Sequence, residues 1–595
     1  MEFMKKAGSG DVKIAGKWLF RYLLIGIVAG FGAVLFHYLC GLGMHYFLDM
    51  MAGYRPASPA GEHLLLPHTQ TPFNRWMLLI LPALGGLVSG WIVYTFAPEA
   101  EGHGTDAAID AYHHKGGIVR GRIPFVKTIA STITLTTGGS GGREGPIAQI
   151  GAGFGSFLAG KLKLSDRERR IMMAAGIGAG VGSIFRAPLA GALFAAEVLY
   201  RDPDFESEVL IPAGISSVVA YCIFCLVFGW GALFDSPQLK FQNPMELGPY
   251  TVLSIILVLA AIFYIKIFYG IIGIFKKIKI PNFLKPAIGG FITGIIGFYL
   301  PNTLAFGYGY IQKAIFGELA ITTLILLAVG KIFTTAFSIG SGGSGGVFGP
   351  SIVIGGALGG AVGKLFHIFT PSIVTQPASF VIVGMAGFFS AVSNAPISTI
   401  IFISEITNSY HLLLPSLLVC SLCYLLSRKW TIFQNQVKSR IDSPAHAGEF
   451  MMDILETIKV GALGHLVKDI LCVNEDMPFS EFKNKIFTRT KQHYFPVINR
   501  QGKFCGIFSS TDIREVIFTL HIEDLVVMKD IMVSDLLYTT PSENLNTVLL
   551  KLTQKNIDAL PVVNEEDSGS LIGLIYRRDI IAYYNDHIQR IRGQE

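Results

Sequence analysis

Long stretches of this chain contain no charged side chain at all. Asp, Glu, Lys and Arg are absent from residues 76–97, 209–234 and 286–312, and Lys364 is the only such residue in 332–404. A helix needs about 20 apolar residues to cross the hydrocarbon core of a bilayer. Only 15% of the residues are charged, whereas soluble domains carry about 25%. The chain is therefore predicted to be an α-helical polytopic membrane protein embedded in a lipid bilayer.

Basic residues gather in short segments between the apolar runs. They lie in the N-terminal segment 1–17, in KLKLSDRERR at 161–170 and in KKIK at 276–279. Short loops rich in Lys and Arg stay in the cytoplasm. We therefore expect a multi-pass protein of the cell membrane, the inner membrane of a prokaryote, with both termini cytoplasmic. The first apolar run, about 18–48, is too long for a cleaved signal peptide. The net charge of +6 gives no case for a nucleic-acid partner.

The composition changes abruptly near residue 440. Charged residues return every few positions from about 455 onward, and the long apolar runs end. We expect a transmembrane domain over 18–440, a linker over 441–458 and a soluble cytoplasmic tail after it.

The transmembrane part contains an internal duplication. Residues 138–155 read GGSGGREGPIAQIGAGFG and residues 342–359 read GGSGGVFGPSIVIGGALG, with ten of the eighteen aligned positions identical. A second pair follows, FRAPLAGALFAAE ending at Glu197 and SNAPISTIIFISE ending at Glu405. Such repeats are typical of transporters in which broken helices meet near the bilayer midplane. The predicted repeats cover about 20–231 and 250–427.

The duplicated GGSGG loops are candidate anion sites. Non-helical backbone at membrane depth is tolerated only where it is buried in protein or lines a cavity. The loop amides are unshielded by side chains, and the following proline suits the first turn of a helix. Such amides and the positive end of a helix dipole together bind anions. A soluble phosphate-binding loop does not fit, because neither copy has the Gly-Lys-Ser/Thr ending. Tight helix packing is the expected reason for other glycines, such as Gly151 and Gly155.

These motifs resemble those of the CLC family of chloride channels and proton-coupled chloride transporters. The resemblance rests on GGREGP at 141–146, GGVFGP at 345–350 and the preceding EGHGTD at 101–106. It extends over essentially the whole chain, because many members also carry a C-terminal pair of CBS domains. It implies an inverted-repeat fold of tilted and broken helices, and a homodimer with one pore in each subunit. Dimer contacts are implied for helices around 187–231 and 394–427.

The resemblance also implies which residues form the anion pathway. Glu144 is the implied gate: its ionised carboxylate occupies the anion site, and its protonated form leaves it. Glu144 and Glu197 are the candidates for a proton path. A salt bridge between Glu144 and Arg143 is the weaker alternative, because adjacent residues at a helix start point to different sides and ionisable groups buried in membranes are functional by default. The implied anion-binding residues are His103, Gly104, Arg143, Gly145, Val347, Phe348 and Phe433.

Three positions depart from the family pattern. His103 stands where the first loop usually has serine, and its role as ligand or bystander stays open. Val198 takes the place of the internal glutamate of proton-coupled members. Phe433 replaces the tyrosine of the inner gate and lacks its hydroxyl. We therefore expect passive conduction, or weakly proton-coupled exchange, of chloride or a similar small anion; stoichiometric chloride/proton antiport is the alternative.

The tail contains its own repeat. Two pairs of segments are similar: 468–479 with 534–545, and 495–512 with 560–579. Each copy predicts a strand, a helix, two short strands joined by a polar turn, and a helix. The copies resemble a pair of α/β CBS modules, over 459–523 and 528–595, which often bind adenine nucleotides.

The same resemblance implies a nucleotide site in the tail. An Asp near the start of the last helix of a module can hold ribose hydroxyls, and the matching residues are Asp512 and Asp579, with Ser509 as a further contact. The second copy has Tyr576 where Ser or Thr is common. Nucleotide sensing and a purely structural brace of the dimer are equal alternatives, and we expect no other cofactor.

Two other classes of function have less support. A CBS-regulated cation transporter would be expected to show clusters of intramembrane carboxylates, and the long spans are nearly free of them. A membrane-embedded enzyme needs a nucleophile–base pair or a metal site, and the chain has no HExxH sequence. Two CxxC pairs lie in apolar helices without a second ligand pair, so we expect packing and no metal: Cys222/Cys225 and Cys420/Cys423.

Overall fold

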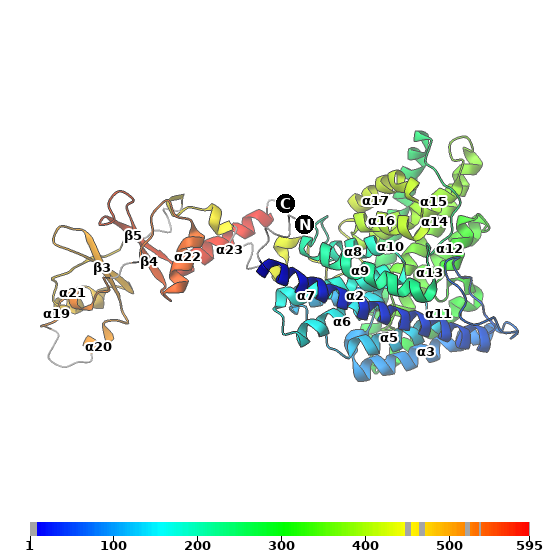
Figure 1. Cartoon of the computed structure of the whole chain (residues 1–595), viewed down its shortest axis with the longest axis horizontal. Coiled ribbons are helices and arrows are strands. Elements are labelled where there is room, and N and C mark those ends of the chain that lie inside the picture. The colour runs from blue at the N-terminus through cyan, green and yellow to red at the C-terminus, as the bar shows by residue number, and fades with distance from the viewer. Residues whose placement is uncertain (1–8, 447–453, 463–469, 518–523, 535–536, 594–595) are drawn as a thin grey trace. The chain divides into compact units, whose positions relative to one another are not determined.

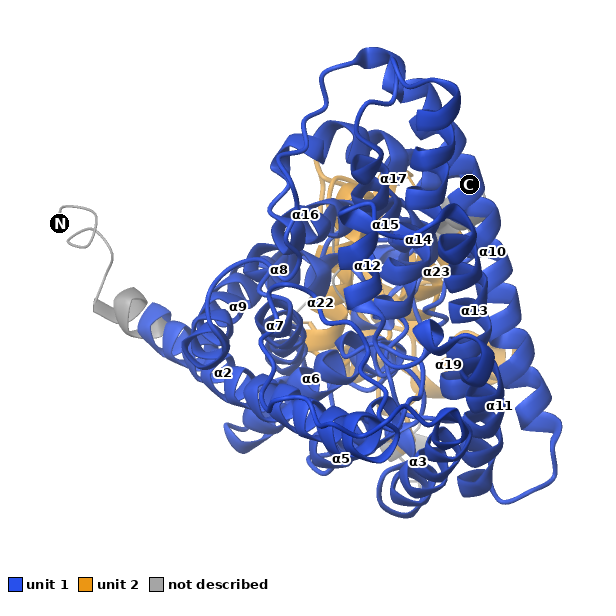
Figure 2. Ribbon diagram, turned by 90° about the vertical axis from the view of Figure 1, so that its right-hand side faces the viewer, with its two compact units in different colours: residues 1–445 blue, residues 446–595 orange. Residues whose placement is uncertain are grey.

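The computed structural model divides the chain into two compact units, residues 1–445 and 446–595 (Figures 1 and 2). The structure describes residues 9–446, 454–462, 470–517, 524–534 and 537–593. Parts of four predicted segments lie outside the described residues: the start of the N-terminal segment, part of the linker, two stretches of the first CBS module and two short stretches of the second.

The first unit is built of helices that repeat in the same order. The first series comprises α2 (Ser9–Gly43), α3 (Arg75–Phe96), α4 (Thr105–His114), α5 (Ile123–Thr136), α6 (Glu144–Lys161), α7 (Asp166–Ile184), α8 (Pro188–Glu197) and α9 (Ser207–Phe228). The second comprises α10 (Leu247–Lys277), α11 (Lys285–Tyr299), α12 (Tyr308–Ile315), α13 (Ile321–Gly340), α14 (Phe348–Phe369), α15 (Pro377–Ser393), α16 (Pro396–Thr407) and α17 (Leu413–Ser427). A turn of π-helix, Met44–Met51, continues α2.

Helix length and composition confirm the prediction of a multi-pass membrane protein. Among the described residues, seven helices are long and apolar enough to cross a bilayer. Four apolar helices are shorter, α5, α8, α15 and α16. Both α8 and α16 begin at the proline of an Ala-Pro pair, where the missing proline amide is not needed. Short helices of this kind are the expected broken helices of a transporter fold.

The short helices α8 and α16 cap each other across the two repeats. The carboxylate of Glu197, which ends α8, accepts two backbone amides at the start of α16, at 3.0 and 2.6 Å. The carboxylate of Glu405 in α16 accepts two amides at the start of α8, at 3.4 and 2.8 Å. A carboxylate at a helix N-terminus satisfies amides that have no partner within the helix. The repeated Ala-Pro…Glu motif therefore produces a reciprocal pair of caps.

Glycines let α6 and α7 pack backbone against backbone. A Cβ added at Gly151 would lie 2.0 Å from the carbonyl oxygen of Gly176, and one at Gly155 would lie 2.1 Å from that of Met172. Any side chain at these positions would force the helices apart. Helix packing thus accounts for these glycines, as expected from the sequence.

The basic segment 161–170 lies beside the start of α2 and the end of the first unit. Arg21 near the start of α2 pairs with Glu168 at 3.4 Å, and Arg170 donates to the carbonyl oxygen of Ala445 at 3.0 Å. We call the face that carries these contacts the basic face. Helix α2 runs away from it (Figure 1) and leads into the segment 52–74, which has no regular helix or strand. We call the face that carries 52–74 the outer face.

The second unit is α/β and contains two small sheets. Its elements are β1 (Val473–Asn474), α19 (Phe479–Lys485), β2 (Tyr494–Ile498), β3 (Phe504–Ser509), α20 (Arg514–Ile517), α21 (Met528–Ile531), α22 (Leu545–Gln554), β4 (Ala559–Val563), β5 (Leu571–Tyr576) and α23 (Arg577–Gly593). Strand β1 is parallel to β2, and β2–β3 and β4–β5 are antiparallel pairs. The predicted order of elements is present in the first copy. In the second copy, the described part of the first strand is a single bridge, Thr539 to Val562.

Candidate anion pathway

Three loops meet at the centre of the first unit. Gly142 and Gly346 exchange two backbone hydrogen bonds, both 2.7 Å long, so the two GGSGG loops form an antiparallel bridge. The Gly102 amide donates to Gly343 at 3.1 Å, and the Gly345 amide donates back to Gly102 at 3.2 Å. Helices α4, α6 and α14 begin within three residues of these contacts. The structure thus brings three helix N-termini to one place, and the first amides of each have no partner within their own helix.

Two fully buried lysines support the loops, one from each repeat. The ammonium group of Lys127 in α5 donates to the carbonyl oxygens of Ala100 and Gly102, at 2.9 and 2.7 Å. The ammonium group of Lys331 in α13 donates to two carbonyl oxygens of the segment before α12, at 3.2 and 2.7 Å. Both side chains are 0% exposed, and neither has a carboxylate partner among the described residues. They add two positive charges near the loops.

The carboxylate of Glu144 lies at the N-terminus of α14. One oxygen accepts the backbone amide of Gly349 at 3.1 Å, and the other accepts the hydroxyl of Tyr308, the first residue of α12. Glu144 is only 3% exposed. Its negative charge therefore sits where the amides of the third loop and the dipole of α14 favour an anion.

Two glycines make room for this arrangement. A Cβ at Gly142 would lie 1.9 Å from a carboxylate oxygen of Glu144, and a Cβ at Gly349 would lie 2.4 Å from the Tyr308 hydroxyl. Any other residue at either position would displace the carboxylate or the phenol. Gly142 and Gly349 are thus explained by the shape of the Glu144 site.

Arg143 points away from Glu144, as expected for neighbours at a helix start. Its guanidinium donates to the carboxylate of Glu62 in the segment 52–74, and it contacts the Nδ1 atom of His37 at 2.9 Å. It also lies over the ring of Phe306, 4.8 Å from the ring centroid, and is only 2% exposed. Arg143 and Glu144 are adjacent in the sequence, but their side chains have different partners. Glu144 is the gate candidate, and Arg143 is buried and paired with the carboxylate of Glu62.

His103 and Phe433 come together from distant parts of the sequence. Their ring centroids lie 5.6 Å apart, and Phe268 lies 6.2 Å from His103. The Nδ1 atom of His103 is buried and has no hydrogen-bond partner among the described residues. A buried polar atom without a partner is costly, so an anion next to a protonated Nδ1 would satisfy it.

The other sequence-predicted residues fall into two groups. The backbones of Gly104 and Gly145 lie against each other, since a Cβ at Gly104 would be 2.7 Å from the carbonyl oxygen of Gly145. Val347 and Phe348 open α14 beside the Gly142–Gly346 bridge. Glu197 lies apart from these groups in the cap described above.

A cleft in the second unit lies between its two halves. It has a volume of about 810 Å³ and is lined by residues of both copies, including Ser509, Tyr576 and four basic side chains: Lys491, His493, Arg577 and Arg578. Asp512 and Asp579 are not among its lining residues. The Asp512 carboxylate accepts both the amide and the hydroxyl of Ser509, at 2.7 and 2.8 Å. The cleft itself is basic and large enough for a small ligand.

The comparisons with known proteins decide the family. A family model described as "Voltage gated chloride channel" matches residues 85–428, more than half of the chain. The chain belongs to the CLC family. Models described as "CBS domain" match residues 460–519 and 528–586, so the second unit of this CLC protein is a pair of CBS domains.

Two curated relatives agree with the membership. A putative chloride channel protein, ClcB-like, of Ralstonia nicotianae is 31% identical over 370 residues, which cover 62% of this chain and 86% of the relative. The H⁺/Cl⁻ exchange transporter ClcA of Vibrio parahaemolyticus is 27% identical over 403 residues, which cover 67% of this chain and 83% of the relative.

Two solved structures agree in fold. A slow cyanobacterial Cl⁻/H⁺ antiporter matches with a TM-score of 0.62 at 24% identity, over 69% of this chain and 94% of its own. A eukaryotic CLC transporter matches with a TM-score of 0.55 at 20% identity, over 94% of this chain and 98% of its own. The predicted family and fold class, an inverted-repeat CLC domain followed by a CBS pair, are thereby confirmed.

Four functional candidates of this CLC chain were not expected from the sequence: Glu62, Lys127, Tyr308 and Lys331. A signal existed for the lysines, because each stands 17 residues before the first residue of its duplicated helix, Glu144 or Phe348. No comparable signal marks Tyr308 or Glu62. They reach the site only through tertiary packing.

Proposed function

We propose that this CLC protein carries chloride, or a similar small anion, across the membrane through a pathway gated by Glu144. One observation carries the proposal: the Glu144 carboxylate accepts an amide at the N-terminus of α14, in the place that the loops offer to an anion. A carboxylate in that place excludes an anion of the same charge. The anion-binding roles of Arg143, Val347, Phe348, His103 and Phe433 belong to this proposal.

The gate works through protonation of Glu144. The ionised carboxylate is held by the Gly349 amide and the Tyr308 hydroxyl. A proton removes its charge and weakens both hydrogen bonds, because charged acceptors are the stronger ones. The neutral side chain then leaves and an anion takes its place. Proton arrival and anion entry are linked at this one group.

We propose that the link between proton and anion flux is weak. Val198 cannot carry a proton, and the phenyl ring of Phe433 cannot donate to an anion. Both oxygens of Glu197 already accept backbone amides, which supports a structural role for that residue. Strict antiport is the second candidate, favoured by the description of the Vibrio relative as an exchanger. We propose no enzymatic reaction.

The assembly and its orientation complete the proposal. A homodimer through α8, α9, α16 and α17 is supported by exposed apolar side chains on each helix: Leu189, Ile211, Ile397 and Leu417. The basic face supports a cytoplasmic location for both termini. The basic cleft of the CBS pair supports an adenine nucleotide ligand.

Flux from proteoliposomes tests the function. Purified protein is loaded into vesicles with a chloride gradient, and chloride and protons are recorded together. We expect chloride efflux that increases as the pH falls, with few protons moved per chloride. Glu144→Gln should keep the efflux and lose most of its pH dependence. Absence of chloride efflux under every gradient would refute the proposal.

A further inference from the structure

The segment 52–74 is anchored over the outer face at several points. The Tyr54 hydroxyl donates to the carbonyl oxygen of Pro301 at 2.7 Å and lies 3.0 Å from the Tyr310 hydroxyl. The Gly61 amide donates to the carbonyl oxygen of Leu233 at 3.0 Å. The segment is therefore held by residues of the second repeat and by Leu233, without the help of Glu62, which follows Gly61 directly.

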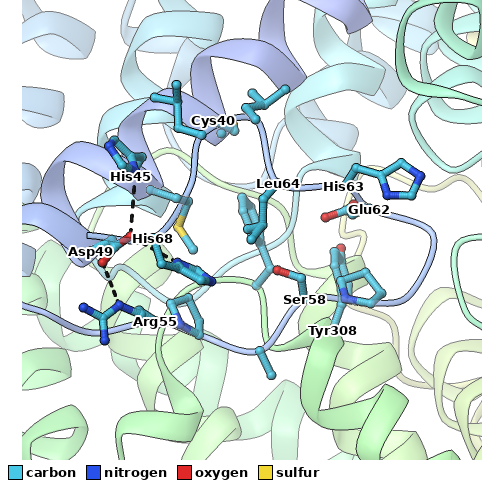
Figure 3. Close-up of a pocket in the computed structure, with 18 of the residues that line it drawn as sticks. Cys40, His45, Asp49, Arg55, Ser58, Glu62, His63, Leu64, His68 and Tyr308 are labelled. Atoms are coloured by element: carbon cyan, nitrogen blue, oxygen red, sulfur yellow. Dashed lines mark hydrogen bonds and ion pairs between the residues drawn. The ribbon is translucent and has the colours of Figure 1, made fainter. Parts of the chain in front are cut away.

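A second cluster fixes the two ends of the segment. The carboxylate of Asp49 accepts from Arg55 at 2.9 Å and from His68 at 3.1 Å (Figure 3). It also accepts from the Thr69 hydroxyl at 2.8 Å. These contacts join residues before and after Glu62. The ion pair between Glu62 and Arg143 is not needed to hold the segment in place.

The Glu62 carboxylate closes the outer approach to Arg143. A cavity of about 120 Å³ is lined by Glu62 and Tyr308 (Figure 3). Arg143 and His37 also line it. Tyr308 also donates a hydrogen bond to the carboxylate of Glu144. The cavity therefore extends to a residue that directly contacts Glu144. The Nε atom of Arg143 is buried and has no hydrogen-bond partner among the described residues. A buried guanidinium with a donor to spare beside a small cavity is suited to a small anion.

The charges around Glu62 favour its ionised form. Burial alone would raise the pKa of Glu62, but the charges of Arg143, His37 and Arg186 hold it below its ordinary value. The Glu62 side chain is only 18% exposed. A buried ion pair is weak evidence for stability, because desolvation offsets the attraction.

We propose that Glu62 is a second carboxylate gate, which competes with an anion from the outer face for the guanidinium of Arg143. An entering anion displaces the Glu62 carboxylate from Arg143 and waits in the cavity before it reaches the Glu144 site. This inference rests on the proposed function. It adds an outer step to the pathway and a residue that sets the affinity for anions from one side.

The test compares Glu62→Gln with the parent in planar bilayers at constant neutral pH, with chloride varied on one side at a time. The amide keeps the size of the side chain and can still accept from Arg143, but it has no charge. We expect the apparent KM for chloride to fall about tenfold on one side of the bilayer and to stay unchanged on the other. The matched control is Glu99→Gln, which removes a carboxylate paired with Arg120 away from the cavity, and should change neither value.

Two further variants separate the outcomes. Tyr54→Phe loosens the anchor of the segment and changes no charge in the cavity, so an equal effect on KM in this variant would overturn the gate in favour of a simple tether. An unchanged KM in Glu62→Gln, or an equal change on both sides, would also overturn it. Glu144→Gln is measured in parallel: if it loses the pH dependence while Glu62→Gln changes nothing, the proposed function stands and only this inference fails.

Discussion

The hydroxyl of Tyr308 donates to the carboxylate of Glu144, and this contact joins the two repeats at the gate. Glu144 opens α6 of the first repeat, whereas Tyr308 opens α12 of the second. The carboxylate is therefore held by a side chain as well as by backbone amides.

Removal of this hydroxyl should ease opening. In Tyr308→Phe the ring stays and the ionised carboxylate loses one donor, so the blocking form is less favoured. We expect the pH of half-maximal anion flux to rise by about one unit, the equivalent of one hydrogen bond to a charged group. Tyr310→Phe is the control on the same helix, because the Tyr310 hydroxyl contacts Tyr54 instead. An unchanged pH profile in Tyr308→Phe would show that the contact does not hold the gate.

The buried lysines should matter for both stability and anion affinity. Lys331→Met leaves two carbonyl oxygens without a donor and removes a positive charge near the pathway. We expect a lower melting temperature in detergent, from a loss of about 1–3 kcal/mol per unsatisfied group, and a higher KM for chloride. Lys364→Met is the control, since Lys364 also donates to two carbonyl oxygens but is part-exposed. A KM equal to that of the parent would argue against an electrostatic role.

The reciprocal caps allow a test of the proton path. If Glu197 acts only as a cap, Glu197→Gln and Glu405→Gln should lower thermal stability to a similar extent, because each amide side chain can satisfy only one of two backbone donors. We expect neither substitution to reduce proton flux more than chloride flux. Selective loss of proton movement in Glu197→Gln alone would place the proton path through that residue.

Nucleotide binding to the CBS pair can be followed on the full-length protein. Millimolar adenine nucleotide should raise the melting temperature, because a ligand that binds only the folded state stabilises it. Arg577→Glu reverses a charge of the cleft and should weaken this shift, whereas Arg500→Glu, at an exposed residue outside the lining, should not. If the nucleotide does not change the melting temperature of the parent, a purely structural role of the CBS pair as a brace of the dimer is favoured.

The sequence predicts the duplicated motifs, and the structure shows the contacts between them. The GGSGG loops and the Ala-Pro…Glu motifs occur twice, so their pairing as a bridge and as caps follows from the symmetry of the repeats. Tyr308 and Glu62 have no such counterpart. They lie 164 and 81 residues from their partners, and only the packing of α12 and of the segment 52–74 brings them to the pathway. The three-dimensional arrangement was needed to find them.

The central claim is that the Glu144 carboxylate blocks the pathway until it is protonated. The most direct measurement is chloride efflux from proteoliposomes that contain either the parent or Glu144→Gln. The pH is varied from about 4 to about 8, a range that covers the ordinary titration of a carboxyl group and its shifts. We expect efflux in the parent to rise as the pH falls, and efflux in the variant to be high and nearly constant throughout. A variant whose pH response matches that of the parent would contradict it.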